Sequence, residues 1–329
     1  MTIMGLHKSL SLFVLVICIV SCGGSSRLGS STAGGDSGGS EVFAATEVLV
    51  PERNLYAVSD DAQVLVGGNV YIRNGTTTVV AAPAGAGVAF DHLTPDGTVA
   101  IGKYGRPYPH GNMLLAYSPE FGVVDFYKPQ RSDLQFRGLD PDGTVWITHG
   151  GVAGGQAGAF KWKYPGPEVP VTGEEVPPWL AFDGADTTPE GYYEHRLFRA
   201  SPNRQWAIGW ARTRLEDGSV RMDWLLWSVT APPERLPLEL GAAERVDDTG
   251  KVITGAEWVT PSELEYRVWV RGHPVVTLAE ALRLGGADVS ASPLLKIAGY
   301  SPNRRLLICT DPLETGYRHF LLRVDPEGK

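Results

Sequence analysis

Cysteine is scarce in this chain of 329 residues, which contains only Cys18, Cys22 and Cys309. The first two lie at an apolar N-terminal stretch, whereas Cys309 ends the apolar run 306–309. If the N-terminal stretch is removed and Cys22 is modified, one thiol remains and no intramolecular disulfide can form. The hydrophobic core must therefore stabilise the fold, and we expect Cys309 to be a buried structural thiol.

Long hydrophobic runs are also missing. The longest apolar stretch covers residues 10–20, after a start with one basic residue, Lys8, and it is well short of the roughly 20 residues that span a bilayer. This arrangement predicts a cleaved signal peptide over residues 1–21. Residues 19–22, Ile-Val-Ser-Cys, resemble the lipobox of bacterial lipoproteins, in which the signal is cut before an acylated cysteine. An ordinary secretory signal cut elsewhere and a short anchor helix are the alternatives.

The lipoprotein resemblance implies a location and a first partner. Cys22 would carry palmitate-type acyl chains that insert into membrane lipid, so we expect the protein in the bacterial cell envelope, outside the membrane that anchors it. Gly23 stands where many lipoproteins of an inner membrane have aspartate, which is compatible with the outer membrane of a host that has one. Residues 22–44 are predicted to form a tether, in which the Gly- and Ser-rich stretch 23–40 is a flexible coil with a root-mean-square span of roughly 25 Å.

Basic residues are outnumbered by acidic ones. The chain has 29 Lys and Arg against 37 Asp and Glu, and removal of Lys8 leaves 28 against 37, a net charge of −9. A moderately acidic chain with mixed charges argues against nucleic acid and against a second, electrostatic contact with the membrane. The nine tryptophans indicate a packed core. About 300 residues without the signal suit one large all-β domain or two average ones.

Recognisable catalytic and metal-binding motifs are absent. The histidines are scattered without the paired spacing of a metal site, and no Gly-x-Ser-x-Gly, Walker loop or His-Glu-x-x-His occurs. The Asp-Pro-Asp-Gly at 140–143 resembles the start of a calcium loop but lacks the later ligands, so we interpret it as a structural turn. We therefore predict no cofactor, no metal and no catalytic residue from motifs, although a centre assembled from distant parts of the chain would leave no motif.

One short pattern is abundant and recurs six times. Each copy places a tight turn between two apolar strands, as in residues 92–102 and 138–148. Four of the six turns read Ser/Thr/Asp-Pro-Asp/Asn, followed by Gly or Arg. Proline presets φ, Asp or Asn accepts a backbone hydrogen bond, and Gly tolerates a positive φ. The equivalent turn positions are 60, 95, 141, 202, 248 and 302, spaced by 35, 46, 61, 46 and 54 residues. This spacing suits four-stranded propeller blades with variable loops.

These hairpins predict an all-β fold, a six-bladed β-propeller over residues 45–329. A third strand follows each hairpin, and a fourth follows five of them, near 77–80, 123–127, 169–172, 235–239 and 275–278. The sixth unit ends after its third strand, so we expect residues 45–50 to complete the last blade and close the ring. One short helix is predicted at 277–285, where Thr277 and Glu280 have capping-box spacing and Gly285 can end the helix.

The turn motifs suggest a family. Thr94-Pro-Asp-Gly, Asp140-Pro-Asp-Gly, Ser201-Pro-Asn and Ser301-Pro-Asn resemble TolB-type propeller repeats, and also the HAF repeats of bacterial extracellular proteins. The resemblance covers nearly all of the chain after the tether and implies a propeller in an envelope setting. The first and fifth units lack the proline, and the Asp-Gly pairs usual after the second strand are missing. The motifs are chiefly structural, so no catalytic residue is carried over.

Long loops provide one set of candidate contacts. Alternating strand directions place the first-to-second and third-to-fourth turns on one face of the disc, and the other connections on the opposite face. The first set is short, whereas the long insertions belong to the second set: 103–112, 173–195, 212–218 and 277–285. Their aromatic side chains beside charged groups suit an envelope protein, peptide or glycan; these candidates are Tyr104, Trp179, Tyr192 and Tyr193. Neutral surface insertions are the alternative.

The central channel, lined by the first strand of each blade, is the second candidate site. Just before the turns these strands carry Asp91, His92, Arg137, Arg199, Glu244 and Arg245. Such groups could converge on an anionic ligand. A solvated channel wall with paired charges is the alternative. The sequence does not fix the strand register, which decides which of these residues point inward. The function we expect is a membrane-anchored extracytoplasmic binding or interaction module. The alternative is a hydrolase or lyase that uses Asp91, His92 or Glu244.

Overall fold

The computed structural model describes residues 42–48, 54–83, 86–107, 109–140, 142–152, 157–171, 182, 188–289, 295–313, 316–325 and 327. The predicted signal peptide, Cys22 and the tether as far as residue 41 lie outside these residues. Within them, no helix is both long enough and apolar enough to cross a membrane.

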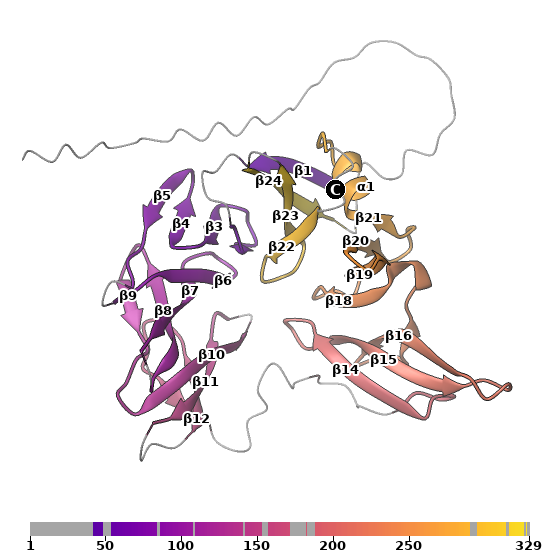
Figure 1. Cartoon of the computed structure of the whole chain (residues 1–329), viewed down its shortest axis with the longest axis horizontal. Coiled ribbons are helices and arrows are strands. Elements are labelled where there is room, and N and C mark those ends of the chain that lie inside the picture. Colours follow the sequence, from indigo (N-terminus) through magenta and orange to yellow (C-terminus); the bar gives the residue numbers. More distant parts are fainter. Residues whose placement is uncertain are drawn as a thin grey trace, which may run out of the picture.

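The chain is a β-propeller, in which antiparallel sheets follow one another around a centre in chain order (Figure 1). Four sheets have four strands each. They are β6 (Val88–Leu93), β7 (Ala100–Arg106), β8 (Gly111–Ser118) and β9 (Gly122–Asp125); β10 (Arg131–Leu139), β11 (Val145–Gly151), β12 (Gly158–Trp162) and β13 (Val169–Pro170); β14 (Glu194–Ala200), β15 (Trp206–Arg214), β16 (Val220–Ser228) and β17 (Glu234–Arg235); and β18 (Ala242–Val246), β19 (Val252–Thr260), β20 (Glu263–Val270) and β21 (Val276–Thr277). A short 3₁₀ helix, η2 (Leu238–Leu240), precedes β18.

The remaining sheet has eight strands in the order β1-β24-β23-β22-β2-β3-β4-β5. They are β1 (Phe43–Val48), β24 (Gly316–Val324), β23 (Leu306–Leu313), β22 (Lys296–Tyr300), β2 (Ala57–Val58), β3 (Val64–Gly67), β4 (Val70–Arg73) and β5 (Thr76–Val79). One parallel pair, Ala57 with Tyr300, joins its two four-stranded halves. The backbones approach this closely because Gly299 has no Cβ, which would collide with the carbonyl oxygen of Tyr56. The repeat pattern predicts separate sheets, and this junction between the first and last units differs from that prediction.

The predicted closing strand is confirmed. β1 pairs antiparallel with β24 along its length, from Phe43 opposite Val324 to Val48 opposite His319. It begins at Phe43, within the segment predicted as tether. The first and last strands of the described chain therefore share one sheet, and pairing with β1 covers the edge that β24 would otherwise expose.

Five of the six turns are stabilised by the side chain of their first residue; in the remaining turn, Asp140 instead accepts bonds from Trp146 and Arg204. In the copy at 301–306, the Leu306 amide donates to Ser301 Oγ at 3.1 Å, and Ser301 Oγ donates to Asn303 Oδ1 at 2.7 Å. The corresponding bond to the amide five residues on recurs at Ser59, Thr94, Ser201 and Asp247. A positive φ follows in every copy, at Ala62, Gly97, Gly143, Arg204, Gly250 and Arg304. The units that lack proline still form the turn because this hydrogen bond does not need it.

Apolar clusters join neighbouring sheets. One cluster spans the units around β3, β7 and β11 and includes Tyr71, Phe90 and Phe160. Others join the β15 and β19 sheets, the β19 and β23 sheets, and the two halves of the eight-stranded sheet. Cys309 is fully buried in one of them, as expected, and burial raises the pKa of its thiol.

The predicted helix is confirmed as α1 (Leu278–Leu284). Thr277 and Glu280 form the expected capping box, in which the Glu280 amide donates to Thr277 Oγ1 at 3.2 Å, and Gly285 caps the C-terminus. Its apolar face buries Leu278, Ala281 and Leu282 next to β1 and β20. The predicted fourth strands are also present, although β13, β17 and β21 have only two residues each.

The turn hydrogen bond makes a stability prediction. Replacement Ser301→Ala leaves the buried Leu306 amide without its acceptor and should lower the free energy of unfolding by about 1–3 kcal/mol. Ser262→Ala, at the exposed tip between β19 and β20, is the matched control and should change it by less than about 0.5 kcal/mol. Urea unfolding followed by tryptophan fluorescence measures both; equal effects of the two replacements would contradict the role assigned to Ser301.

Candidate ligand-binding site

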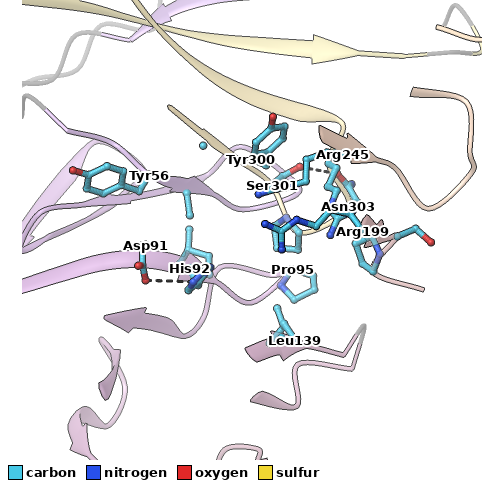
Figure 2. Close-up of a pocket in the computed structure, with 18 of the residues that line it drawn as sticks. Tyr56, Asp91, His92, Pro95, Leu139, Arg199, Arg245, Tyr300, Ser301 and Asn303 are labelled. Carbon is cyan, nitrogen blue, oxygen red and sulfur yellow. Dashed lines mark hydrogen bonds and ion pairs between the residues drawn. The ribbon is translucent and has the colours of Figure 1, made fainter. Parts of the chain in front are cut away.

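A cavity of about 780 Å³ lies where the innermost strands of the sheets end in the repeated turns. All six residues predicted from the sequence to line the channel line this cavity: Asp91, His92, Arg137, Arg199, Glu244 and Arg245. Turn residues of the same repeats, among them Pro95, Pro202 and Pro302, complete its wall. Figure 2 shows Asp91 and His92 with Arg199 and Arg245 across from them in this view.

Five of the innermost strands contain a β-bulge. At each bulge, two consecutive residues line the cavity. The registers skip one residue at the same distance before each turn, and the skipped residues are Asp91, Arg137, Phe198, Glu244 and Ala298. In a regular strand, consecutive side chains point to opposite faces. A bulge opposes two residues to one and breaks this alternation, so Asp91 and His92 both line the cavity, as do Glu244 and Arg245. The sequence left open which of these neighbouring residues point into the channel; in the structure, both residues of each pair do so.

Glycines opposite the bulges allow the strands to bend. Gly209 pairs with Leu197, and a Cβ on Gly209 would collide with the carbonyl oxygen of Arg196. Gly255 pairs with Ala243 at the next bulge, where a Cβ would lie 2.5 Å from the Leu240 carbonyl oxygen. Glycine ends most copies of the repeat and is the signal in the sequence from which these bulges could have been predicted.

The acidic groups of the β6 and β10 sheets are already neutralised. Asp91 accepts a bond from Lys103 Nζ at 2.8 Å and lies 3.5 Å from His92 Nε2. Asp140 pairs with Arg204 at 2.5 Å and accepts the indole N–H of Trp146 at 2.7 Å. On this side of the cavity the alternative of paired charges is correct.

Two further carboxylates connect neighbouring repeats at the turns. The amide of Asn303 donates to Asp60 Oδ1 at 2.9 Å, and the amide of Asn203 donates to Asp248 Oδ1 at 2.6 Å. Burial raises the pKa of both Asp60 and Asp248, and these amide bonds oppose the rise. Their role is therefore to join turns of adjacent units.

Two of the arginines also have partners in the wall. Arg304 Nη1 donates to the carbonyl oxygens of Ala200 at 2.8 Å and Val246 at 2.9 Å, which links three repeats. Burial lowers its pKa to about 10, and the positive charge of Arg245 adds to this effect. Arg245 Nη1 donates to the backbone carbonyl of Glu244 at 2.8 Å, so it does not neutralise the Glu244 carboxylate directly.

Arg199 and Glu244 differ from the other charged groups. Within the described part of the chain, neither side chain forms a hydrogen bond or an ion pair; the Arg199 guanidinium lies 5.3 Å from the ring centroid of Phe198. Burial lowers the pKa of Arg199, with a further decrease from Arg245 and an opposing effect of Glu244. Burial raises the pKa of Glu244, and Arg245 and Arg199 oppose this. The cavity thus holds one cation and one anion without a bonded partner.

His92 forms an aromatic surface with a residue of the next sheet. Its ring stacks on Phe136 with centroids 3.8 Å apart and an interplanar angle of 21°. Burial lowers the pKa of His92, while Asp91 partly opposes the shift. A neutral imidazole stacked on a phenyl ring offers an apolar contact at neutral pH.

The loop candidates are less well supported. Tyr104 was expected in a loop, but it lies in β7, is 2% exposed and donates to Asp125 Oδ1 at 2.6 Å. Burial raises its pKa to about 12. The expectation was wrong because residues 103–106 extend the β7–β8 hairpin. Residues 212–214 extend β15 in the same way.

Tyr192 and Tyr193 lie beside a shallow depression with Thr213 and Arg214. Tyr192 donates to Asp223 Oδ2 at 2.9 Å, whereas Tyr193 is 50% exposed. Trp179 lies outside the described residues.

The arrangement needed for the enzymatic alternative is not seen in the described residues. His92 and Asp91 are neighbours in β6, and Glu244 lies in β18. Among the residues that the structure describes, no three His, Cys, Asp or Glu side chains gather closely enough to hold a metal ion.

Comparisons with known proteins assign no family. No family model and no curated protein matches the chain. A TolB protein from Agrobacterium tumefaciens is similar in structure, with 13% identity, a TM-score of 0.38, and coverage of 84% of this chain and 92% of that one. An oligogalacturonate lyase from Vibrio parahaemolyticus has 12% identity, a TM-score of 0.36, and coverage of 83% and 77%. The propeller domain of the trilobed protease from Pyrococcus furiosus has 9% identity, a TM-score of 0.34, and coverage of 86% and 84%. These similarities assign no residue and no activity.

The surroundings of His92 predict its titration. We expect its pKa below the ordinary value of 6.5, and Asp91→Asn should lower it further, because loss of the carboxylate destabilises the imidazolium and leaves Lys103 unpaired. NMR titration measures both, with the resonance assigned from its loss in His92→Gln. A pKa above 6.5, or an increase in Asp91→Asn, would contradict this description.

Proposed function

We propose that this protein is a lipid-anchored, extracytoplasmic binding module whose small anionic ligand occupies the central cavity of a six-bladed propeller. The two halves of the eight-stranded sheet count as two blades in this description. The observation that carries the proposal is Arg199, whose guanidinium lines the cavity without a hydrogen bond or ion pair in the described chain. The Arg199 side chain is exposed to solvent in the cavity wall, so an anion that enters the cavity can reach it and accept its N–H bonds.

The shape and composition of the cavity support a small ligand. A volume of about 780 Å³ lies within the range of roughly 300–1,000 Å³ that is typical of sites for small molecules. Arg137 and Arg245 increase the positive potential near Arg199, since both line the same cavity. Guanidinium groups bind carboxylates and phosphates through two parallel N–H donors, which adds geometric selectivity to the charge. The cavity therefore suits an acidic small molecule better than a macromolecular surface.

The loop face is the weaker location for this function. Tyr104 is buried in a strand, and the hydroxyl of Tyr192 is engaged by Asp223. An enzymatic role lacks a specific supporting observation, because Asp91 is occupied by Lys103 and His92. We therefore assign binding to the cavity and no chemistry to its residues.

Anchoring through Cys22 would orient the cavity. The chain enters β1 at Phe43, which pairs with Val324, and the Val324 amide donates to the carbonyl oxygen of Arg305 just after the sixth turn. The tether therefore joins the propeller on the side that carries the repeated turns and the cavity. In a lipid-anchored protein this side would face the membrane, and the ligand would be one that reaches the membrane surface.

Binding of acids should depend on Arg199. Small carboxylates, tested against their uncharged amides (succinate against succinamide, N-acetylglycine against its amide), should raise the melting temperature of the wild-type domain, whereas the amides should not. Arg199→Gln should abolish the difference, because it removes the unpaired cation. Arg283→Gln, on the exposed side of α1, is the matched control and should retain it. An equal response to acids and amides in the wild type would overturn the proposal.

Anchoring should depend on Cys22. In a bacterial host given a clickable palmitate analogue, the full-length chain should be labelled and recovered with membranes. Cys22→Ser should lose the label and accumulate as an uncleaved or released form, since the thiol is the acceptor of the lipid. Cys309→Ser is the control and should keep the label, because Cys309 is buried in the core. Labelling of Cys22→Ser to the wild-type level would refute the anchor.

A further inference from the structure

Resting on the proposed function, we infer that the ligand is a small zwitterion, an α-amino acid or a dipeptide with both termini free, held between Arg199 and Glu244. The two residues lie on neighbouring innermost strands, since β14 packs beside β18. Both line the cavity, and each influences the pKa of the other. Neither has a bonded partner in the described chain, and no ion pair joins them to each other.

The bulge explains why Glu244 is unpaired. Glu244 is the extra residue of the β18 bulge, and Arg245 follows it. Arg245 directs Nη1 to the backbone carbonyl of Glu244 and holds its guanidinium 5.6 Å from the ring centroid of Tyr300. It therefore contributes charge to the region without forming an ion pair with the Glu244 carboxylate.

The other charged groups around the cavity are already engaged. Asp91 is bound to Lys103, Asp140 to Arg204, and Asp248 to the Asn203 amide. Arg304 is bound to two backbone carbonyls. Arg137 and Arg245 still add positive charge to the cavity. Among the described residues, however, Arg199 and Glu244 are the charged side chains of its wall that form no hydrogen bond or ion pair, so these two can bond directly with a ligand.

This arrangement favours a zwitterion over a simple anion. A carboxylate can accept two parallel N–H bonds from Arg199. A second negative or neutral ligand group near Glu244 would leave that carboxylate without a partner in a confined space, whereas an ammonium group satisfies it. Tyr266 also lines the cavity, and its hydroxyl has no hydrogen bond among the described residues, so it can accept a bond from an ammonium group.

Another part of the same cavity provides an apolar contact for a side chain. The His92–Phe136 stack and Leu139 line the wall formed by the β6 and β10 sheets. A zwitterion with an apolar or aromatic side chain can place its charged groups at Arg199 and Glu244 and its side chain in the remaining volume. Phenylalanine is therefore a suitable probe.

Isothermal titration calorimetry with three forms of one probe tests the inference. Wild-type domain is titrated with phenylalanine, with N-acetylphenylalanine, which lacks the ammonium, and with phenylalaninamide, which lacks the carboxylate; the dipeptide phenylalanylglycine is tested in the same three forms. In at least one of the two sets, the free form should bind roughly tenfold more tightly than either blocked form. This factor corresponds to about 1.4 kcal/mol, which is near the lower end of the value of one hydrogen bond to a charged group.

Charge-removing variants assign the two ends. Glu244→Gln should abolish the preference for the free form over the acetylated form and retain the requirement for a carboxylate. Arg199→Gln should abolish the preference for the free form over the amide and retain the preference for the free form over the acetylated form. The matched control Glu216→Gln, at the exposed β15–β16 tip, should behave as wild type, and urea midpoints establish that each variant is folded.

The possible results separate the two proposals. If N-acetylphenylalanine and the acetylated dipeptide bind as tightly as the free forms, while the amides bind weakly, the zwitterion is wrong and the anion site stands. If no form binds and carboxylates do not stabilise the domain, both proposals fail. The blocked ligands keep the test valid even where a variant does not fold.

Discussion

In five of the six turns, the side chain of the first residue accepts a hydrogen bond from the amide five residues on, and the rest of the structure depends on this bond. At Ser301 this bond joins the ends of the two inner strands of a unit. It holds the intervening turn at the cavity, where the next residues bind the neighbouring repeat, as Asn303 does with Asp60. The same short motif thus shapes the hairpin and joins the units into a ring. Serine, threonine and aspartate can all supply the acceptor, which explains the variation among these copies.

The second constraint lies just before five of the six turns. There a bulge in the innermost strand places two consecutive residues on the cavity wall, and glycines such as Gly209 and Gly255 on the paired strand allow the close approach. In a regular innermost strand, only every second side chain would point toward the centre of the propeller. A bulge places two consecutive side chains there. Because these residues differ between the copies of the repeat, together they form an asymmetric site. This is how Arg199 and Glu244 come to lie in one cavity without pairing with each other.

Local features were predictable from the sequence and non-local ones were not. The turns, the closing strand β1 and the capped helix depend on residues close together in the chain or on a count of strands, and the structure confirms them. Tyr104 was misplaced because its burial depends on Asp125, two strands away, which a loop-length argument does not consider. The junction of β2 with β22 joins the first and last units. The pairing of Asp91 with Lys103, and its absence at Glu244, depend on side-chain directions that alternation alone does not give.

The central claim is that the bulged pairs face a cavity in which Arg199 and Glu244 bind a ligand. A crystal structure of the domain grown with phenylalanine or phenylalanylglycine tests this claim most directly. We expect electron density for the ligand in the cavity, with its carboxylate on Arg199 and its ammonium on Glu244. An ion pair between Arg199 and Glu244 that closes an empty cavity, or one residue of each bulged pair turned away from it, would contradict the account.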